Sequence, residues 1–462
     1  MEGEPFPSAR VRLLRAARRE TRPELQHAVW SLAWPVILTL VSESMVGVVD
    51  VLMVGRLGAA AVAAVGVGAQ ILSAVSVVMT AVGTGTLALV ARQVGAGRQQ
   101  ETDRILGQSI VAALGLSIVV VAPVILGVGR LVGVFGVTPE VAGLTGAFVR
   151  RVMLSIPAAA VVFVIGAGLR GAGDTRTPLA IGVVINVLNV AFNYVLIFGK
   201  LGFPALGVRG SGLATTVAFT TGAVMGCLLL VRGRLRLTIT PDDLRPRLEP
   251  IRRVLAVGYP AAAEQLLIQI GFFLYVVFVA RYGTKAVAAY FIGARIMALS
   301  FLPGFGFAAA AGALVGQYLG AHDPRRAESA GWLATRLSVY LMSTTGLVIF
   351  LGARHIAALF VADPEVVAGT VSFMYVLGVA QPLMGIDFTL GGALRGAGDT
   401  RFPLVTVLVA FYGCRLGASW VVSSLEHLSL TWLWSAVIGD YVARAALKWW
   451  RFAGGRWKAV TV

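Results

Sequence analysis

The sequence predicts an all-α integral membrane protein: twelve transmembrane helices in two parallel six-helix repeats around a central cleft. Three features support this fold class, namely a low charge content, apolar runs of membrane length and an internal repeat. The chain of 462 residues is 57% hydrophobic and 13% charged, whereas a soluble domain carries about 25% charged residues. So few charges cannot cover a globule of this size in water, and therefore much of its surface must face lipid.

Apolar runs of about 20 residues, the length that a helix needs to cross a bilayer, recur along the whole chain. The first set predicts helices near residues 29–55, 62–90, 105–128, 148–168, 179–199 and 211–231. The second set predicts helices near residues 254–280, 287–315, 330–351, 366–393, 403–422 and 431–450. We therefore expect a basic tail (1–27), an N-lobe (28–231), a linker (232–253), a C-lobe (254–450) and a second tail (451–462).

The basic residues predict the orientation in the membrane. The net charge is +17. The arginines gather in the tails and in the gaps between apolar runs, and they form no patch interleaved with aromatic residues. We therefore expect no nucleic-acid partner. With the amino terminus inside, cytoplasmic segments hold roughly three basic residues for each one outside. This bias predicts a multi-pass protein of the plasma (bacterial inner) membrane with both termini, the linker and both tails in the cytoplasm.

The chain repeats itself at a spacing of 225 residues. The segment Leu169-Arg-Gly-Ala-Gly-Asp-Thr-Arg176 recurs without change as residues 394–401. The same spacing pairs residues along both halves, for example Pro35 with Pro260, Gly58 with Gly283 and Pro157 with Pro382. Because each half has an even number of helices, both begin on the same side of the membrane and form parallel repeats. Two such bundles can rock about the cleft between them and expose it to each side of the membrane in turn. Because one chain contains both bundles, we expect a functional monomer.

These motifs resemble the multidrug and toxic compound extrusion (MATE) family over nearly the whole chain after the tail. The resemblance depends on the doubled loop and on three further segments, which are Asp50-Val-Leu-Met-Val-Gly-Arg-Leu-Gly58, Pro260-Ala-Ala-Ala-Glu-Gln265 and Leu314-Val-Gly-Gln-Tyr-Leu-Gly-Ala321. It implies cation-driven export of bulky, often cationic, organic compounds. The partners would be small-molecule substrates and the lipid bilayer.

Acids that occur in only one half are the first candidates for function, since a charge inside the membrane is costly. Asp50 and Glu43 lie on one face of the first helix, and the repeat pairs them with the uncharged Tyr275 and Ile268. The resemblance adds that Asp50 matches the family's first-helix acid.

A stripe of amides on the fifth helix completes this candidate site. Asn186, Asn189 and Asn193 are spaced three and four residues apart, so they share one helix face. Carboxylate and amide oxygens suit a proton site or a Na⁺ site. The resemblance matches Asn189 and Asn193 to the family's fifth-helix pair and Thr215 to a sixth-helix threonine, which makes these residues and Asp50 the candidate Na⁺ ligands. Relatives often carry an acid where this chain has Asn193, so the coupling ion stays open between H⁺ and Na⁺.

The second half offers three further candidates. Glu264 matches an acid that some bacterial members use for coupling. Asp387 lies one helical turn after the position, here Met384, at which relatives carry an acid. We expect Arg295 to be buried, where it could neutralise one of these carboxylates or bind an anionic substrate.

The expected function is therefore a cation-coupled (H⁺ or Na⁺) antiporter that exports small organic, often cationic, drugs or toxic compounds by alternating access. No cofactor is expected besides the coupling ion. The alternative is a flippase for lipids or lipid-linked precursors with a similar architecture. An enzyme is not expected, because the sequence has no metalloprotease, nucleophile-elbow or Walker A motif.

Overall fold

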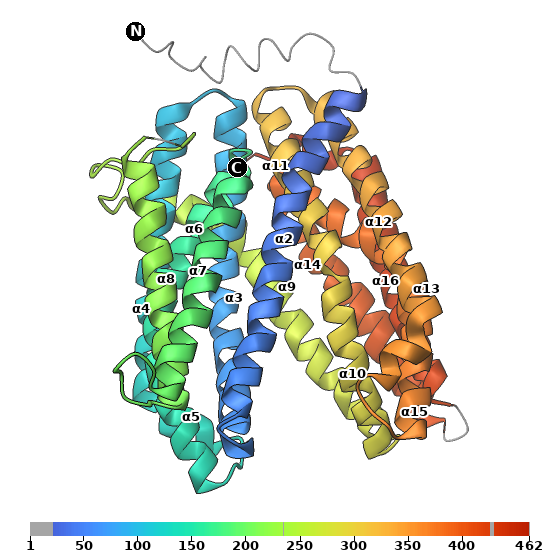
Figure 1. Ribbon diagram of the computed structural model, residues 1–462. Helices are drawn as coiled ribbons and strands as arrows, with labels where there is room; N and C mark the ends of the chain where they lie inside the picture. Colours follow the sequence, from blue (N-terminus) through green and yellow to red (C-terminus); the bar gives the residue numbers. More distant parts are fainter. Residues whose placement is uncertain (1–21, 234, 426–428, 462) are drawn as a thin grey trace. The chain divides into compact units, whose positions relative to one another are not determined.

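The computed structural model describes residues 22–461, except residues 234 and 426–428 (Figure 1). The described chain is helical, and no β-strand occurs within it. The first helices are α2 (Arg22–Gly55), α3 (Ala59–Gly95), α4 (Gln99–Gly133), α5 (Pro139–Val152), α6 (Ile156–Gly171), α7 (Arg176–Phe198) and α8 (Val208–Val231). They are followed by α9 (Leu248–Ala280), α10 (Thr284–Ser300), α11 (Leu302–Gly320), α12 (Pro324–Ala358), α13 (Pro364–Gly396), α14 (Arg401–Val407), α15 (Gly417–Ser424) and α16 (Leu430–Ala453). Most of the basic tail predicted for residues 1–27 lies outside the described residues.

The described part of the chain contains eleven spans that are long and apolar enough to cross a membrane. Each of the twelve predicted segments is helical, but α16 is not among these spans. Its 24 residues carry Asp440, Arg444 and Lys448, whose side chains are buried. The prediction of an all-helical, multi-pass membrane protein is thus confirmed. The arrangement of twelve spans in two six-helix repeats stays a prediction.

Three predicted helices contain a break. The span Pro139–Gly171 consists of α5 and α6 with a 3-10 turn between them, and the span Thr284–Gly320 consists of α10 and α11. Pro157 and Pro303 stand in the first turn of α6 and α11, where a missing N–H costs least. In the last span before α16, a π-helix, Leu408–Leu416, separates α14 from α15.

By their contacts the residues form two compact units. Unit 2 contains Leu38–Leu87 and Gln100–Ala262, and unit 1 contains the rest of the described chain. Helices α2, α3 and α9 therefore each contribute residues to both units. The division into an N-lobe and a C-lobe at residues 232–253 follows the sequence repeat and stays a prediction.

Small residues bring the helices of unit 2 close together. A Cβ at Gly210 would lie 2.5 Å from the Leu196 backbone oxygen, and one at Gly222 would meet the Ile185 side chain. Such positions allow α7 and α8 to pack backbone against backbone, as helices in membranes commonly do. This packing holds the polar faces of α7 and α8 in fixed register.

Unit 1 has its core around α13. Glycines of α13 face the backbone of α11, since a Cβ at Gly392 or Gly396 would overlap Ala308 or Gly312. At the other end of α13, Phe373 packs edge-on to Trp434 of α16 at 5.1 Å between ring centroids. Helix α13 is therefore held from two sides, by α11 and by α16.

The predicted linker is anchored to α4. The Gln108 amide donates to the backbone oxygens of Asp243 and Arg245, both at 2.7 Å, and accepts from the Arg247 backbone N–H at 2.7 Å. The Thr238 hydroxyl donates to the Asp103 carboxylate at 2.9 Å. The described linker residues thus belong to the surface of unit 2 and are not a loose connection.

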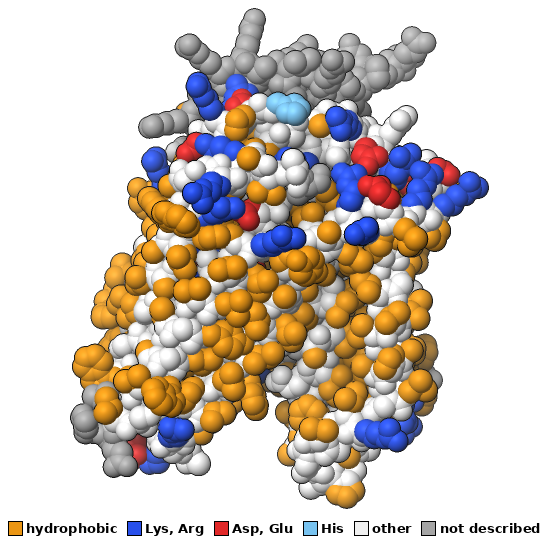
Figure 2. Space-filling model, turned by 180° about the vertical axis from the view of Figure 1, so that it is seen from behind, with side chains coloured by type: hydrophobic (Ala, Val, Ile, Leu, Met, Phe, Trp, Pro, Cys, Tyr) orange, Lys and Arg blue, Asp and Glu red, His pale blue; other side chains and the backbone are white. Residues whose placement is uncertain are grey.

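The described surface has the charge pattern of a membrane protein. Figure 2 shows lysine and arginine side chains gathered near the ends of the helices. Between them the surface that is seen consists of hydrophobic side chains together with uncharged side chains and backbone. An apolar band flanked by basic ends suits a lipid bilayer with its polar headgroups.

Candidate functional site

A chain of polar side chains links α2, α7 and α8 within unit 2. The Asn193 amide nitrogen donates to the Asp50 carboxylate at 2.6 Å and to the Asn189 side-chain oxygen at 3.0 Å. The Asn189 amide nitrogen in turn donates to the Thr215 hydroxyl at 3.2 Å. Asn189 and Asn193 are buried, and Asp50 is half-buried. The structure therefore brings together the four residues that were predicted as candidate Na⁺ ligands.

The same hydrogen bonds leave one buried acceptor without a partner. Both N–H groups of the Asn193 amide are used, by Asp50 and by Asn189, and this determines the orientation of the amide. Its oxygen Oδ1 is buried and has no hydrogen-bond partner among the described residues. An unpaired buried carbonyl is costly, so this oxygen could accept a cation or a donor.

The donor set of this cluster suits a hard monovalent cation or a proton. It offers one carboxylate, two amide oxygens and one hydroxyl, and hard cations prefer oxygen ligands. In the part of the chain that the structure describes, no group of three or more His, Cys, Asp or Glu side chains could hold a metal. With one carboxylate, the cluster is poorly suited to a divalent ion.

Two predicted members of the cluster lie elsewhere in unit 2. Asn186 donates to the Ser42 hydroxyl at 2.7 Å and, like Glu43, lines a cavity of about 410 Å³. The cavity also contains Arg170, whose guanidinium interacts electrostatically with Glu43. The predicted cluster is therefore divided into an Asp50 site and a separate charged cavity.

In unit 1, Glu264 is part of an ion pair. Its two carboxylate oxygens accept from Nη1 of Arg395 at 3.0 and 3.2 Å, and Glu264 itself is buried. Arg395 belongs to the second copy of the repeated segment, residues 394–401. Arg395 therefore neutralises the buried negative charge that made Glu264 a candidate for ion coupling.

Asp387 is likewise paired, with a residue that the sequence did not indicate. The Lys448 ammonium lies 2.5 Å from the Asp387 carboxylate, and both side chains are 2% exposed. Nearby on α16, Asp440 contacts Arg444 at 2.7 Å, as an i,i+4 pair, and Arg415 at 2.8 Å. Unit 1 therefore buries three cations and two acids in this region.

Arg295 differs from the prediction. The structure places it on an exposed part of α10, so the expectation that it is buried is wrong. The carboxylates that it was expected to neutralise have Arg395 and Lys448 as partners. The reason is helix phase, because the neighbouring residues Ile296 and Met297 face the core of unit 1.

Sequence reasoning missed Lys448 and Arg395 as ion-pair partners of acids, and it missed Arg170 as the cation that shares a cavity with Glu43. A signal for the arginines was present, because the repeat pairs Arg170 with Arg395 at helix ends next to apolar segments. Lys448 had no such signal, since Ala223 is its counterpart in the repeat.

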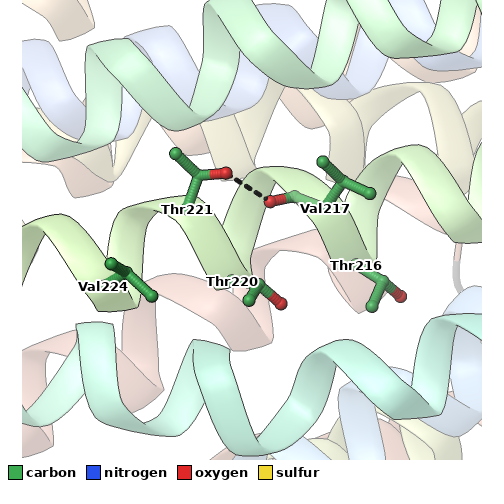
Figure 3. A pocket seen from close by; sticks show the side chains of 5 residues that line it. All are labelled: Thr216, Val217, Thr220, Thr221 and Val224. Carbon is green, nitrogen blue, oxygen red and sulfur yellow. Dashed lines mark hydrogen bonds between the residues drawn. The ribbon is translucent and has the colours of Figure 1, made fainter.

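A second, shallow pocket lies along one face of α8 (Figure 3). Thr216, Thr220 and Val224 are four residues apart, and all three line it together with Val217 and Thr221. The Thr221 hydroxyl donates to the Val217 backbone oxygen at 2.9 Å, within the helix. The pocket has no charged lining, so it offers little for binding an ion.

The described fold is that of a multi-pass membrane protein. The family model MatE matches residues 35–195 and 260–421, and the chain belongs to this family of multidrug efflux transporters. The two matched segments begin 225 residues apart, which is the spacing of the repeat.

Known relatives agree with this membership. The probable multidrug resistance protein NorM of Thermotoga maritima is 29% identical over 95% of each chain. The protein of the same name from Bradyrhizobium diazoefficiens is 30% identical over 89% of this chain and 90% of its own. An outward-facing multidrug resistance MATE family transporter of the MOP superfamily has the same fold, with a TM-score of 0.87 at 22% identity, over 94% of this chain and 97% of its own.

Proposed function

We propose that this chain is a cation-coupled antiporter, driven by H⁺ or Na⁺, that exports small organic, often cationic, compounds by alternating access. The observation that carries the proposal is the Asp50 cluster with the unpartnered Asn193 oxygen. Membership of a family of multidrug efflux transporters supports export as the direction of transport.

The Asp50 cluster can respond to a cation through the Asn193 amide. With Asp50 ionised, the Asn193 amide directs both N–H groups to oxygen acceptors. A cation at Asp50 would compete with one of these N–H groups. A half-turn of the amide would then present its unpartnered oxygen to the cation. Because the contacts join α2, α7 and α8, this exchange would alter how these helices hold together.

Cation binding must favour one conformation if it is to drive transport. Neutralising Asp50 removes a charge-assisted hydrogen bond, which is worth about 1.5–3 kcal/mol. A difference of that size between two conformations shifts their ratio by roughly tenfold to a hundredfold. Export of a substrate against its gradient could then be powered by entry of the ion.

The experiment that tests the proposal uses the purified protein in liposomes. Efflux of ethidium would be followed under an imposed pH gradient and, separately, under a Na⁺ gradient. We expect one gradient to drive transport in the wild type, and Asp50→Asn to abolish it. Glu140→Gln, an exposed acid at the start of α5 in the same unit, is the control and should transport normally.

A third variant separates the two ions. Asn189→Ala removes an amide oxygen that a metal cation needs and a proton does not, so Na⁺-driven transport would fall more than proton-driven transport. If Asp50→Asn transports as fast as the wild type under both gradients, the coupling role of Asp50 is wrong.

The proposal also includes the expected lobes, oligomeric state and membrane orientation. The two sequence halves would act as the rocking lobes, in a functional monomer with both termini in the cytoplasm. A lipid flippase is not favoured, because the NorM relatives are named as multidrug resistance proteins. If the liposomes scrambled lipid and moved no ethidium under either gradient, the flippase would replace the antiporter.

A further inference from the structure

The end of α3 belongs to a different unit from the rest of that helix. Ala88–Gln99 lies in unit 1 with the second half of the chain, although α3 belongs to the first half of the repeat. A Cβ at Gly95 would overlap the Gln317 backbone oxygen of α11, and a Cβ at Gly320 would overlap the Arg92 backbone oxygen. The repeat pairs Gly95 with Gly320 and Arg92 with Gln317, so the contact is reciprocal. Helices from the two sequence halves thus meet within unit 1, backbone against backbone.

The Arg92 side chain fastens this contact to two backbone oxygens. Its Nη2 donates to the Ala397 oxygen at 3.0 Å and to the Val460 oxygen at 2.8 Å. Ala397 follows the last residue of α13, where carbonyls lack partners within the helix and a cation is favoured. Val460 lies in the carboxyl tail. One guanidinium from the first half therefore joins two segments of the second half, 305 and 368 residues away along the chain.

The carboxyl tail is packed against the end of α16. Gly455 has a φ of 69°, a left-handed conformation that glycine adopts at low cost, and it turns the chain back after the helix. Trp457 is buried and stacks on Phe452 at 4.6 Å between ring centroids. Its indole N–H donates to the Phe452 backbone oxygen at 2.7 Å. The tail is therefore a packed part of unit 1 and not a loose end.

An ion pair fixes the tail close to the Arg92 contact. The Lys458 ammonium, two residues before Val460, lies 2.6 Å from the Glu328 carboxylate of α12. Helices α12 and α16 both belong to the second half, so these contacts attach the tail to that half. From there the tail presents the Val460 oxygen to Arg92, which comes from the other half.

The first half also has a guanidinium at the equivalent helix end, but it comes from the linker. The repeat pairs Ala397 with Ala172. The Ala172 oxygen accepts from Nη1 of Arg236 at 3.1 Å, and both of these residues lie in unit 2. That contact stays within the first half and its linker, whereas the Arg92 contact connects the two halves. Of the two, the Arg92 contact must break when the halves separate at this end.

We propose that Arg92 is a catch that holds the end of α3 to the second half of the chain, and that the carboxyl tail supplies one of its two acceptors. The inference rests on the proposed alternating access, in which the halves rock against each other. Opening this end, on the predicted cytoplasmic side, would break both hydrogen bonds of a charged donor, so the catch favours the closed arrangement. Arg92 is thus a positioning residue, which acts on the arrangement of helices and not on the ion or the substrate.

The test measures how often this end opens, from the rate at which a water-soluble maleimide alkylates a buried cysteine in lipid nanodiscs without any ion gradient. The reporter is Ala91→Cys, because Ala91 is buried on α3 next to Gly316 of α11. Cys227→Ala and Cys414→Ala remove the two native thiols. Arg92→Gln should raise the alkylation rate about tenfold or more, as the loss of a hydrogen bond from a charged donor would give.

Further variants test the role of the tail and of the charge. Lys458→Ala frees the tail from Glu328 without touching Arg92 and should raise the rate about threefold, the effect of a partly exposed ion pair. Added to Arg92→Gln it should raise the rate no further, because the tail then has no donor to hold. Arg92→Lys keeps a cationic donor and should restore most of the wild-type rate. Arg325→Gln, an exposed arginine in the first turn of α12, is the matched control and should change nothing.

A second cysteine separates the release of a catch from general loosening. Ala380 is buried in the core of unit 1, about four helical turns from the end of α13 that Arg92 contacts, so Ala380→Cys should react at the wild-type rate in every variant. The proposal is overturned if Arg92→Gln leaves the Ala91→Cys rate unchanged or raises both rates equally. A further rise when Lys458→Ala is added would overturn the part assigned to the tail. Because no gradient is applied, the catch can fail while Asp50-dependent transport succeeds, and the reverse.

Discussion

The buried pair between Lys448 and Asp387 allows a quantitative test of whether Asp387 is structural. Coulomb's law at an effective dielectric constant of about 20 gives a gross attraction of about 7 kcal/mol for unit charges 2.5 Å apart. Desolvation of the two ions costs several kcal/mol each and offsets most of this attraction. The intact pair thus contributes little net stability, but a single partner left alone is strongly unfavourable.

The perturbation is Lys448→Met, which leaves the Asp387 carboxylate buried without its cation. We expect the free energy of unfolding to fall by about 3–5 kcal/mol. Asp387→Asn should cost less, because Lys448 still contacts the backbone oxygen of residue 387 at 3.3 Å. The double variant, with both charges removed, should recover most of the loss of Lys448→Met.

The assay is reversible unfolding in mixed micelles, followed by intrinsic tryptophan fluorescence and arranged as a double-mutant cycle. Ethidium transport by the same variants gives an independent readout. If Asp387 is structural, the double variant is both stable and active. A loss below about 1 kcal/mol in Lys448→Met, or a double variant no more stable than it, would refute the reasoning.

Three further outcomes are expected. Asn193→Asp should add a second carboxylate to the Asp50 cluster and tighten Na⁺ binding, as measured by Na⁺-dependent thermal stabilisation; no change would contradict the candidate Na⁺ site. Gly396→Ala should destabilise unit 1 by about 1–3 kcal/mol, because its Cβ overlaps α11, whereas Gly146→Ala has open space and should be neutral or stabilising in the same unfolding assay. Hydrogen bonds from the backbone N–H groups of Glu365 and then Val366 hold the pKa of Asp363 below its ordinary value. Its capping of α13 is therefore complete above pH 4 and is lost as the pH falls through the lowered pKa. Protection against hydrogen exchange at the start of α13, relative to the intrinsic exchange rate at each pH, should therefore fall only in acid and, in Asp363→Ala, be low at every pH.

Much of the site could be predicted because helix periodicity is a local property. The three- and four-residue spacing of Asn186, Asn189 and Asn193 puts them on one face of any α-helix, whatever surrounds it. The spacing does not determine which acidic side chain these asparagines contact. The structure assigns Asp50 to Asn193 across 143 residues of chain and leaves Glu43 in a separate cavity with Arg170.

The sequence by itself determined that the chain is a helical, multi-pass membrane protein of the MATE type. Apolar length, the repeat and the family motifs are all readable along the chain, because a bilayer requires each helix to satisfy its own backbone. The tertiary structure decided the partners of the charges, such as Lys448 for Asp387 and Arg395 for Glu264. It also decided that Arg295 is exposed. The physical reason is that an ion pair depends on helix phase and on packing between segments distant in the chain, and neither is encoded in the composition of a single helix.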